Sequence, residues 1–433
     1  MTSRRRRVVV TGLGVATALG LDVEENWQKL LAGTSGIRRL SLPFAAKSAV
    51  QGVGEVVEGD WKKIEEEFGR DSSEEGERRT LFGLWAAKQA LADAGVLDGQ
   101  GERDRYGVVL AAGLGINRLE DIERWLDAGR RFSFVKFGRS YTEVHRESIM
   151  RNNSHRTSVL IGKVFGLRGT NCTVTSACAS ATQAIGMGYR AIRRGDADLI
   201  AAGGSDSMIN PVGLVFFVLL GAASTSSENL PESCRPFDRK RSGLVMGEGA
   251  GIVVLEEESH AVKRGARIYG EVAGYGSSLD AYQVTAPDPR GLGAERSMKA
   301  AIEDAGIPID GIDYINAHGT STKLNDAMET TAIKSVFQDH ANRIAISSSK
   351  SMIGHLLAAS GGPEFVYTVL TVKGDAIHPT INITNRDPKC DLDYVPNEKR
   401  KKTVRAALSN SFGFGGQNAS IIVKKYCGEN SCN

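Results

Sequence analysis

Hydrophobic residues in this chain form short runs that alternate with longer stretches of helical periodicity. The strand-like runs lie at 6–14, 106–115, 197–204 and 249–257, and helix-like stretches lie at 81–95 and 181–195. Because the two signals alternate along the chain, the pattern predicts an α/β fold whose strands are mostly internal.

Two sequence patterns occur twice, in the same order, roughly two hundred residues apart. KQALADAGV followed by YGVVLAAGLG resembles KAAIEDAGI followed by IDYINAHGT, and ASATQAIGMGYRAIRRGDA resembles AASGGPEFVYTVLTVKGDA. These echoes predict a duplicated α/β half. We therefore divide the chain into halves at 1–260 and 261–425, followed by a tail at 426–433.

The segment 115–158 fits this alternation least well, since it is rich in Arg and Glu and has no clean period. It lies between a predicted strand and the helix-like stretch at 181–195. We interpret it as an insertion that forms a lid or faces a second subunit.

Composition excludes several classes of protein. The formal net charge of +3 over 433 residues is too small to indicate nucleic-acid binding. The N-terminal apolar run is too short for a signal peptide, and no run of membrane-spanning length follows. The six cysteines lack metal-like spacing and predict reduced thiols. We expect a cytoplasmic enzyme that binds neither nucleic acid nor membrane, with no metal and no cofactor.

The stretch VTSACASATQAIG places Cys178 between a β-branched run and a predicted helix. A helix N-terminus favours a thiolate through its dipole, whereas a free cysteine is also a common core residue. Local sequence leaves both interpretations open. The stretch VTGLGVATALG near the N-terminus resembles a dinucleotide fingerprint, but Thr17 occupies the third glycine position, so Gly12 and Gly14 indicate a structural turn.

Three further motifs in the second half favour the nucleophile. INAHGTST carries His318, and SSSKSMIGHLLAAS carries Lys350 and His355, each at a predicted strand-to-helix junction. SNSFGFGGQN at 409–418 is a glycine-rich loop without the Lys-Ser/Thr of a phosphate-binding loop.

Together with RPFDRKRSGLVMGEGAGIVVLEE at 235–257, these motifs resemble the β-ketoacyl-(acyl carrier protein) synthases, in particular the elongating type 2 condensing enzymes of the thiolase superfamily. The resemblance covers nearly the whole chain. It implies a five-layered αβαβα fold built from two similar halves, a homodimer, and a substrate carried by an acyl carrier protein. The implied reaction is the decarboxylative condensation of malonyl-carrier with an acyl chain during fatty acid elongation.

The resemblance also implies a role for each matching residue. Cys178 would accept the acyl chain as a thioester, His318 and His355 would act on the malonyl group, and Lys350 would order the site. The remaining positions would be the gate Phe414 with its glycines Gly413, Gly415 and Gly416, the pantetheine-channel residues Thr320 and Thr322, the acyl-pocket residues Leu114 and Phe217, and Glu364 behind the site.

These residue types suit the chemistry. A thiolate forms and releases thioesters readily, two imidazole N–H groups can hold an enolate oxygen, and the backbone N–H groups of Cys178 and Phe414 can hold a second oxyanion. On this interpretation the helix dipole lowers the pKa of the Cys178 thiol without a dedicated base.

Lys323 and Gln417 depart from the family pattern, which usually has proline and threonine there, so a polyketide or unusual fatty acid pathway stays open. A catalytically silent chain-length-factor-like partner subunit lacks the cysteine. A thiolase needs a second catalytic cysteine, which SFGFGG does not supply. Because carrier proteins are acidic, a basic docking patch is expected. Its candidates are Lys62, Lys63, Arg78, Arg79, Arg130 and Arg131.

Overall fold

The computed structural model describes residues 6–42, 45–69, 77–97, 103–115, 122–143 and 153–428. Its centre is a ten-stranded sheet with the order β10-β9-β13-β14-β8-β1-β7-β6-β4-β5. The strands of the first half are β1 (Val8–Ala16), β4 (Tyr106–Ala112), β5 (Asn171–Val174), β6 (Leu199–Ser207) and β7 (Glu248–Glu257). Those of the second half are β8 (Gly270–Leu279), β9 (Tyr314–Asn316), β10 (Ala345–Ser347), β13 (Ala406–Gly413) and β14 (Gln417–Lys424).

The two halves of the sheet have the same connectivity. The order β5-β4-β6-β7-β1 in the first half corresponds strand by strand to β10-β9-β13-β14-β8 in the second. Parallel pairing at β5-β4-β6 and antiparallel pairing at β6-β7-β1 recur at the equivalent places. The halves join where Val8–Val10 pairs with Gly270–Val272. The predicted α/β duplication is therefore confirmed.

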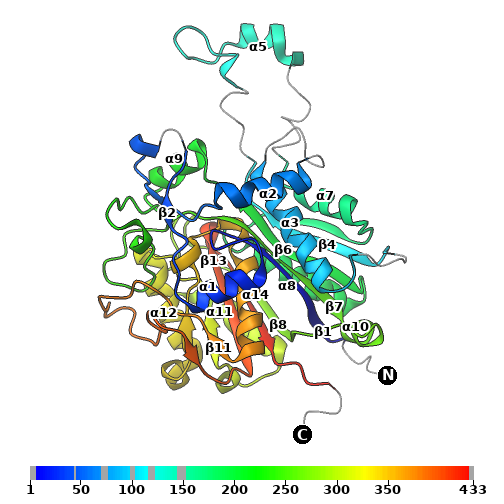
Figure 1. Ribbon diagram of the computed structural model, residues 1–433. Coiled ribbons are helices and arrows are strands. Elements are labelled where there is room, and N and C mark those ends of the chain that lie inside the picture. Colours follow the sequence, from blue (N-terminus) through cyan, green and yellow to red (C-terminus); the bar gives the residue numbers. More distant parts are fainter. Residues whose placement is uncertain are drawn as a thin grey trace.

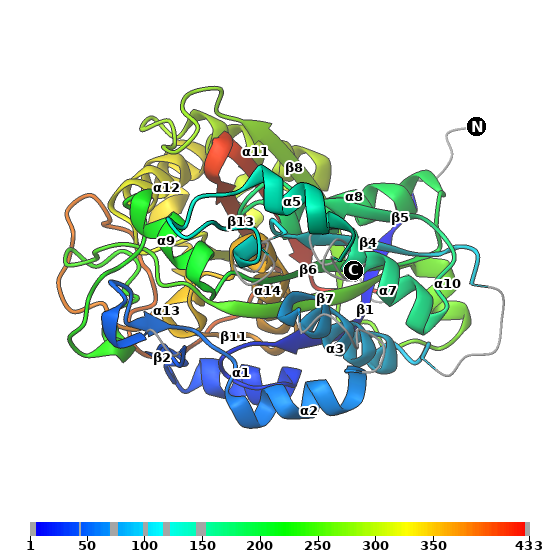
Figure 2. The same ribbon diagram turned by 90° about the horizontal axis from the view of Figure 1, so that it is seen from above.

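Helices form three layers around the two halves of the sheet (Figures 1 and 2). Between them lie α8 (Ser180–Arg194) and α14 (Gly361–Gly374), and outside them lie α3 (Arg78–Asp93) with α7 (Arg156–Phe165), and α11 (Leu292–Ala305) with α12 (Lys323–Phe337). This is the predicted five-layered αβαβα arrangement.

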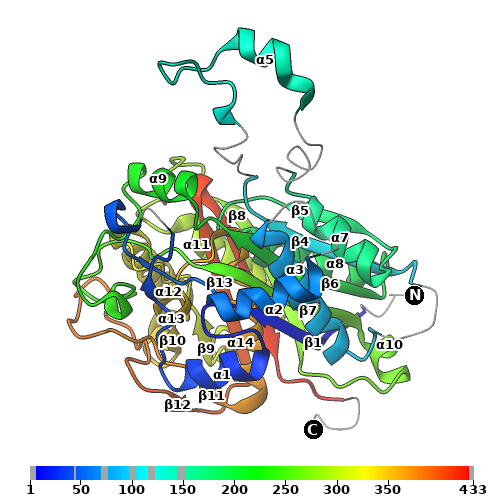
Figure 3. The same ribbon diagram turned by 45° about the horizontal axis from the view of Figure 1, so that its top comes forward.

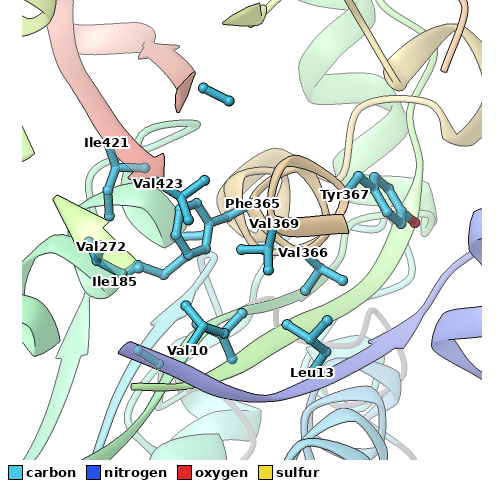
Figure 4. Close-up of a cluster of buried hydrophobic side chains, with 14 of the residues drawn as sticks. Val10, Leu13, Ile185, Val272, Phe365, Val366, Tyr367, Val369, Ile421 and Val423 are labelled. Atoms are coloured by element: carbon cyan, nitrogen blue, oxygen red, sulfur yellow. The ribbon is translucent and has the colours of Figure 1, made fainter. Parts of the chain in front are cut away.

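The largest hydrophobic core fills the middle of the molecule (Figure 4). Phe365 and Val369 of α14 and Ile185 of α8 pack there against Val10 and Val272 of the sheet. Each half has one further core, which lies under its outer helices. Since α8 and α14 begin beside each other in this core, the residues that precede them are also brought together.

Gly12 and Gly14 belong to this packing and not to a ligand site. A Cβ on Gly12 would lie 2.0 Å from the Ala90 carbonyl oxygen, and one on Gly14 would lie 1.9 Å from that of Ala86. Strand β1 therefore approaches the backbone of α3 closely, which only glycine permits at these two positions.

Other α-helices and two short strand pairs complete this body. They are α1 (Val23–Leu31), α2 (Glu58–Phe68), α9 (Pro211–Leu219), α10 (Glu258–Lys263), α13 (Lys350–Ile353) and the short pairs β2 (Arg38–Arg39) with β3 (Gly52–Val53) and β11 (Ala376–Ile377) with β12 (Arg400–Lys401). Among the described helices, none combines the length and apolar character needed to cross a membrane.

The predicted insertion includes helix α5 (Phe134–Ser140), which Figures 1 and 3 place apart from the main body. Its aromatic side chains contact one another: the ring centroids of Trp125 and Phe137 are 4.9 Å apart, and those of Phe132 and Phe134 are 5.1 Å apart. Phe134 nevertheless remains 80% exposed. Residues 116–121 and 144–152 of the insertion lie outside the described ranges.

Candidate active site

Cys178 occupies a tight turn between β5 and α8. Ala177 has a φ of +50°, in the left-handed region that residues other than glycine rarely adopt. Ser180, the first residue of α8, holds the turn: its hydroxyl accepts the Ser176 N–H at 2.7 Å and donates to the Ala177 carbonyl at 2.6 Å. The turn places the Cys178 side chain at the helix N-terminus, 4% exposed.

Two histidines from the second half meet this cysteine. His318 follows β9, and His355 follows α13. His355 Nε2 lies 3.1 Å from Cys178 Sγ, and the two imidazole centroids are 5.4 Å apart. One side-chain atom of each residue lies within 4.8 Å of the others. The structure thus brings together three predicted site residues that are separated by up to 177 positions.

Hydrogen bonds fix the same tautomer in both rings. The Leu357 N–H points at His355 Nδ1 from 3.2 Å, and because an N–H only donates, that nitrogen is the acceptor. His318 Nδ1 faces the Lys350 ammonium at 3.4 Å, which also only donates. The proton of each neutral ring therefore lies on Nε2, the nitrogen that His355 directs at Cys178 Sγ.

Both imidazoles are held neutral. Burial lowers the pKa of His318 and of His355 well below 6.5, and the Lys350 charge lowers both further. A metal ion would need an unprotonated ring nitrogen on each histidine. Since Nδ1 is occupied and Nε2 carries the proton, the cluster is built to donate hydrogen bonds to an anion and not to ligate a cation.

Lys350 lies fully buried behind the histidines. It forms an ion pair with Glu364 and donates to the His318 carbonyl oxygen at 2.6 Å. Burial raises the pKa of Glu364 to about 7, although the Lys350 charge opposes this. Lys350 thus contacts His318 both at the carbonyl oxygen and at the imidazole ring, and these two contacts fix the position of His318.

Glu329 is a site residue that sequence reasoning missed. From α12 its carboxylate accepts the backbone N–H groups of His318 and Gly319, each at 2.8 Å. It is fully buried, which raises its pKa to about 7. Two acids three positions apart, Asp326 and Glu329, interrupt the apolar face of this helix, and that was the available signal.

The glycine-rich loop reaches Cys178 from the other side. Gly415 and Gly416 have φ values of +77° and +74°, and a Cβ on Gly413 would lie 3.0 Å from the Cys178 nitrogen. These glycines let Phe414 direct its backbone N–H at the Cys178 sulfur. Two N–H donors, one from Phe414 and one from His355, thus converge on the thiol.

Cys178 and Phe414 line both of two cavities. One has a volume of about 560 Å³ and also contains the two histidines, Thr320 and Thr322, whose hydroxyl oxygens are 2.9 Å apart. The other has about 230 Å³, is mostly apolar, and contains Leu114 and Phe217. Leu220 and Thr285 also line both cavities, so Phe414 is one of four residues that lie between them.

Asp206 was not predicted from sequence and lines the smaller cavity. Its carboxylate accepts the backbone N–H groups of Ala358 at 3.0 Å and Ser207 at 2.9 Å. Burial raises its pKa to about 6. Through these hydrogen bonds, the carboxylate connects the turn that follows His355 to strand β6.

The environment of Cys178 corrects the expectation of a low thiol pKa. Burial raises the pKa of Cys178 to about 12, while the Lys350 charge and the Phe414 N–H act in the opposite direction without offsetting it. This environment therefore favours the thiol over the thiolate at neutral pH.

Alkylation of Cys178 by iodoacetamide should accordingly accelerate steeply with pH. A raised pKa means that the thiolate is a small fraction at neutral pH, and this fraction grows about tenfold per pH unit until the pKa is approached. We expect the rate, followed by intact mass, to rise without a plateau from pH 7 to pH 9.5. A plateau below pH 8 would show that the dipole and Lys350 outweigh burial.

The prediction of a docking role is wrong for two residues, Arg78 and Arg79. The Arg79 side chain is buried, pairs with Glu77 and donates to the Gly113 carbonyl at 2.8 Å. Arg78 forms an ion pair with the buried Glu248 and lies over the ring of Trp61. Neither guanidinium is available to a partner. Lys62, Lys63, Arg130 and Arg131 are exposed and stay candidates.

Comparison with known proteins identifies relatives over the whole chain. The family model described as "Beta-ketoacyl synthase, N-terminal domain" matches residues 5–261, and "Beta-ketoacyl synthase, C-terminal domain" matches residues 269–384. The chain is 41% identical over 424 residues to 3-oxoacyl-[acyl-carrier-protein] synthase 2 of a Synechocystis species, covering 98% of this chain and 99% of the relative. The protein of that name from Staphylococcus aureus is 36% identical over 437 residues, with the same coverage.

Solved structures give the same result. A β-ketoacyl synthase from Burkholderia phymatum superimposes with a TM-score of 0.84 at 34% identity, and covers 98% of this chain and 100% of its own. A chain from a type II polyketide acyl-carrier protein in complex with its ketosynthase superimposes with a TM-score of 0.87 at 32% identity, with the same coverage.

Proposed function

The chain belongs to the β-ketoacyl synthase family and is a condensing acyltransferase, and we propose that it elongates an acyl chain held as a thioester on Cys178 with two carbons from malonyl-acyl carrier protein. The observation that carries this proposal is the convergence of a buried thiol and two neutral imidazole Nε2–H donors on one cavity. The name shared by its relatives, 3-oxoacyl-[acyl-carrier-protein] synthase 2, supports fatty acid elongation.

Acyl transfer comes first. Cys178 sulfur attacks the carbonyl of the acyl-carrier thioester, the carbonyl oxygen takes the negative charge, and the N–H groups of Cys178 and Phe414 hold it. Collapse of this intermediate breaks the bond to the pantetheine sulfur. The proton lost by the Cys178 thiol is matched by the one that the departing pantetheine thiol gains, and His355 Nε2–H stabilises the sulfur while it is anionic.

Condensation uses the histidines on the second substrate. The malonyl thioester oxygen accepts both Nε2–H groups, CO2 leaves with cleavage of its C–C bond, and the electron pair forms an enolate at that oxygen. The enolate carbon then attacks the Cys178 thioester, and the thiolate departs to leave a 3-oxoacyl chain on the carrier. Neutral imidazoles suit this step because they donate hydrogen bonds without giving up a proton.

A homodimer is part of the proposal. Strand β5 ends the sheet order, and among the described strands it pairs only with β4. Its free edge, with Asn171 exposed and the following residues partly exposed, offers unpaired backbone groups to a second copy.

The second candidate is a polyketide ketosynthase, which the similarity to the polyketide ketosynthase complex favours. In both cases Cys178 carries the acyl group, so the two differ in the chain that is accepted. We expect acyl-carrier substrates to acylate Cys178, and fatty acyl groups of increasing length to be accepted until the smaller cavity is filled. Intact-mass measurement of the protein with acyl-carriers of increasing chain length shows whether Cys178 is acylated and which chains are accepted. No mass increase with any of them would refute the proposed function.

A further inference from the structure

Three basic side chains line the outer part of the larger cavity and have no assigned role. Arg239, Lys240 and Lys323 belong to the same cavity wall as Cys178, His318 and His355. All three are exposed, whereas Cys178 is buried. The three cations therefore stand at the open end of the cavity, and the reacting groups stand at its closed end.

The charges of these side chains are not used by the fold. Among the residues that the structure describes, no carboxylate forms an ion pair with any of the three. Their neighbour Arg241 is different, since it is buried and pairs with Asp387 and Asp326. Asp280 in the same wall is held by the Asn418 side chain at 2.7 Å and by the Asp288 N–H at 3.0 Å.

Stability of the local structure does not account for Lys323. It is the first residue of α12, after the N-cap Thr322, whose hydroxyl accepts the Asn325 N–H at 3.3 Å. A cation in the first turn of a helix is disfavoured by the helix dipole. Lys323 thus adds positive potential at the cavity entrance, although its charge lowers the stability of the helix.

We propose that Arg239, Lys240 and Lys323 bind the phosphodiester of the carrier's pantetheine arm as it enters the cavity. This inference rests on the proposed function. A carrier-bound acyl group hangs from an arm that is attached to the protein through one phosphodiester. Lys240 and Lys323 would bind such a group as point charges, and Arg239 would bind it through its planar guanidinium. Leu324, 62% exposed in the same wall, offers an apolar contact beside the cations, as the dimethyl group next to the phosphate requires.

Three substrates with the same acyl group separate the phosphate from the rest of the carrier: acyl-pantetheine, acyl-4′-phosphopantetheine and acyl-carrier protein. The variant is the triple change Arg239→Ala, Lys240→Ala and Lys323→Ala. Its control removes Lys88, Lys299 and Lys334, three exposed lysines that each pair with a carboxylate away from the cavity. Acylation of Cys178 is measured by intact mass at several salt concentrations.

We expect the triple variant to lose about tenfold in kcat/KM with acyl-phosphopantetheine and with acyl-carrier protein, and to keep its rate with acyl-pantetheine. The difference from the unaltered protein should shrink as salt rises. The control should match the unaltered protein with all three substrates.

Other outcomes overturn the inference. A loss confined to acyl-carrier protein would mean that the cations dock the protein surface of the carrier, an equal loss with all three would mean a structural role, and no loss would mean no role. If the unaltered protein acylates Cys178 with none of the three, the proposed function fails, and that result is distinct from a failure of the phosphate site.

Discussion

Replacement of Cys178 by alanine is expected to abolish both acyl transfer and condensation, with a fall of at least about a thousandfold in each. Among the described residues that line the two cavities, Cys178 carries the only thiol. The fold should not change, because the thiol contributes little more than a buried methyl-sized volume. Transfer of labelled acyl groups and formation of 3-oxoacyl-carrier measure the two activities.

The variant Cys178→Gln separates decarboxylation of the malonyl group from condensation. Its amide oxygen can reach the N–H donors of residue 178 and Phe414, where the oxygen of the acyl thioester would lie, so the site mimics the acylated state. We expect it to decarboxylate malonyl-carrier while forming no condensation product. Cys427→Ala, which changes a partly exposed thiol near the end of the described chain, is the matched control and should retain full activity. Condensation by the alanine variant would disprove the assignment of the nucleophile.

Replacement of Lys350 by methionine is expected to lower both stability and decarboxylation. It leaves the buried Glu364 without its ion-pair partner, which typically costs about 3–5 kcal/mol in the free energy of unfolding. It also removes the donor to His318 Nδ1, so the ring no longer has a fixed tautomer. We expect decarboxylation to fall about a hundredfold and acylation of Cys178 to fall much less.

The double variant Lys350→Met/Glu364→Leu separates these two effects. With both charges replaced by apolar groups, unfolding by denaturant should return close to that of the unaltered protein, since buried ion pairs are often replaced without loss of stability. Decarboxylation should remain low, because His318 still lacks its partner. Recovery of both properties together would show that Lys350 acts only through stability.

The sequence by itself determined the fold class and the duplication. Strand and helix periods are local properties, and the echoes of KQALADAGV and ASATQAIG correspond to the pairs α3 with α11 and α8 with α14. The residues at the strand-to-helix junctions were also visible, because a cysteine, a lysine or a histidine among small residues and hydroxyls stands out in the sequence. Their identification therefore needed no contact between distant parts of the chain.

Only the tertiary structure decided how these groups behave. The 3.1 Å contact between His355 and Cys178, the tautomers of both histidines and the support of His318 by Glu329 all depend on segments that meet only after α8 and α14 pack together. Burial likewise reversed two expectations, since it raises the pKa of Cys178 and hides Arg79. Desolvation and hydrogen-bond geometry depend on what surrounds a group in space, and no local pattern of residues records those surroundings.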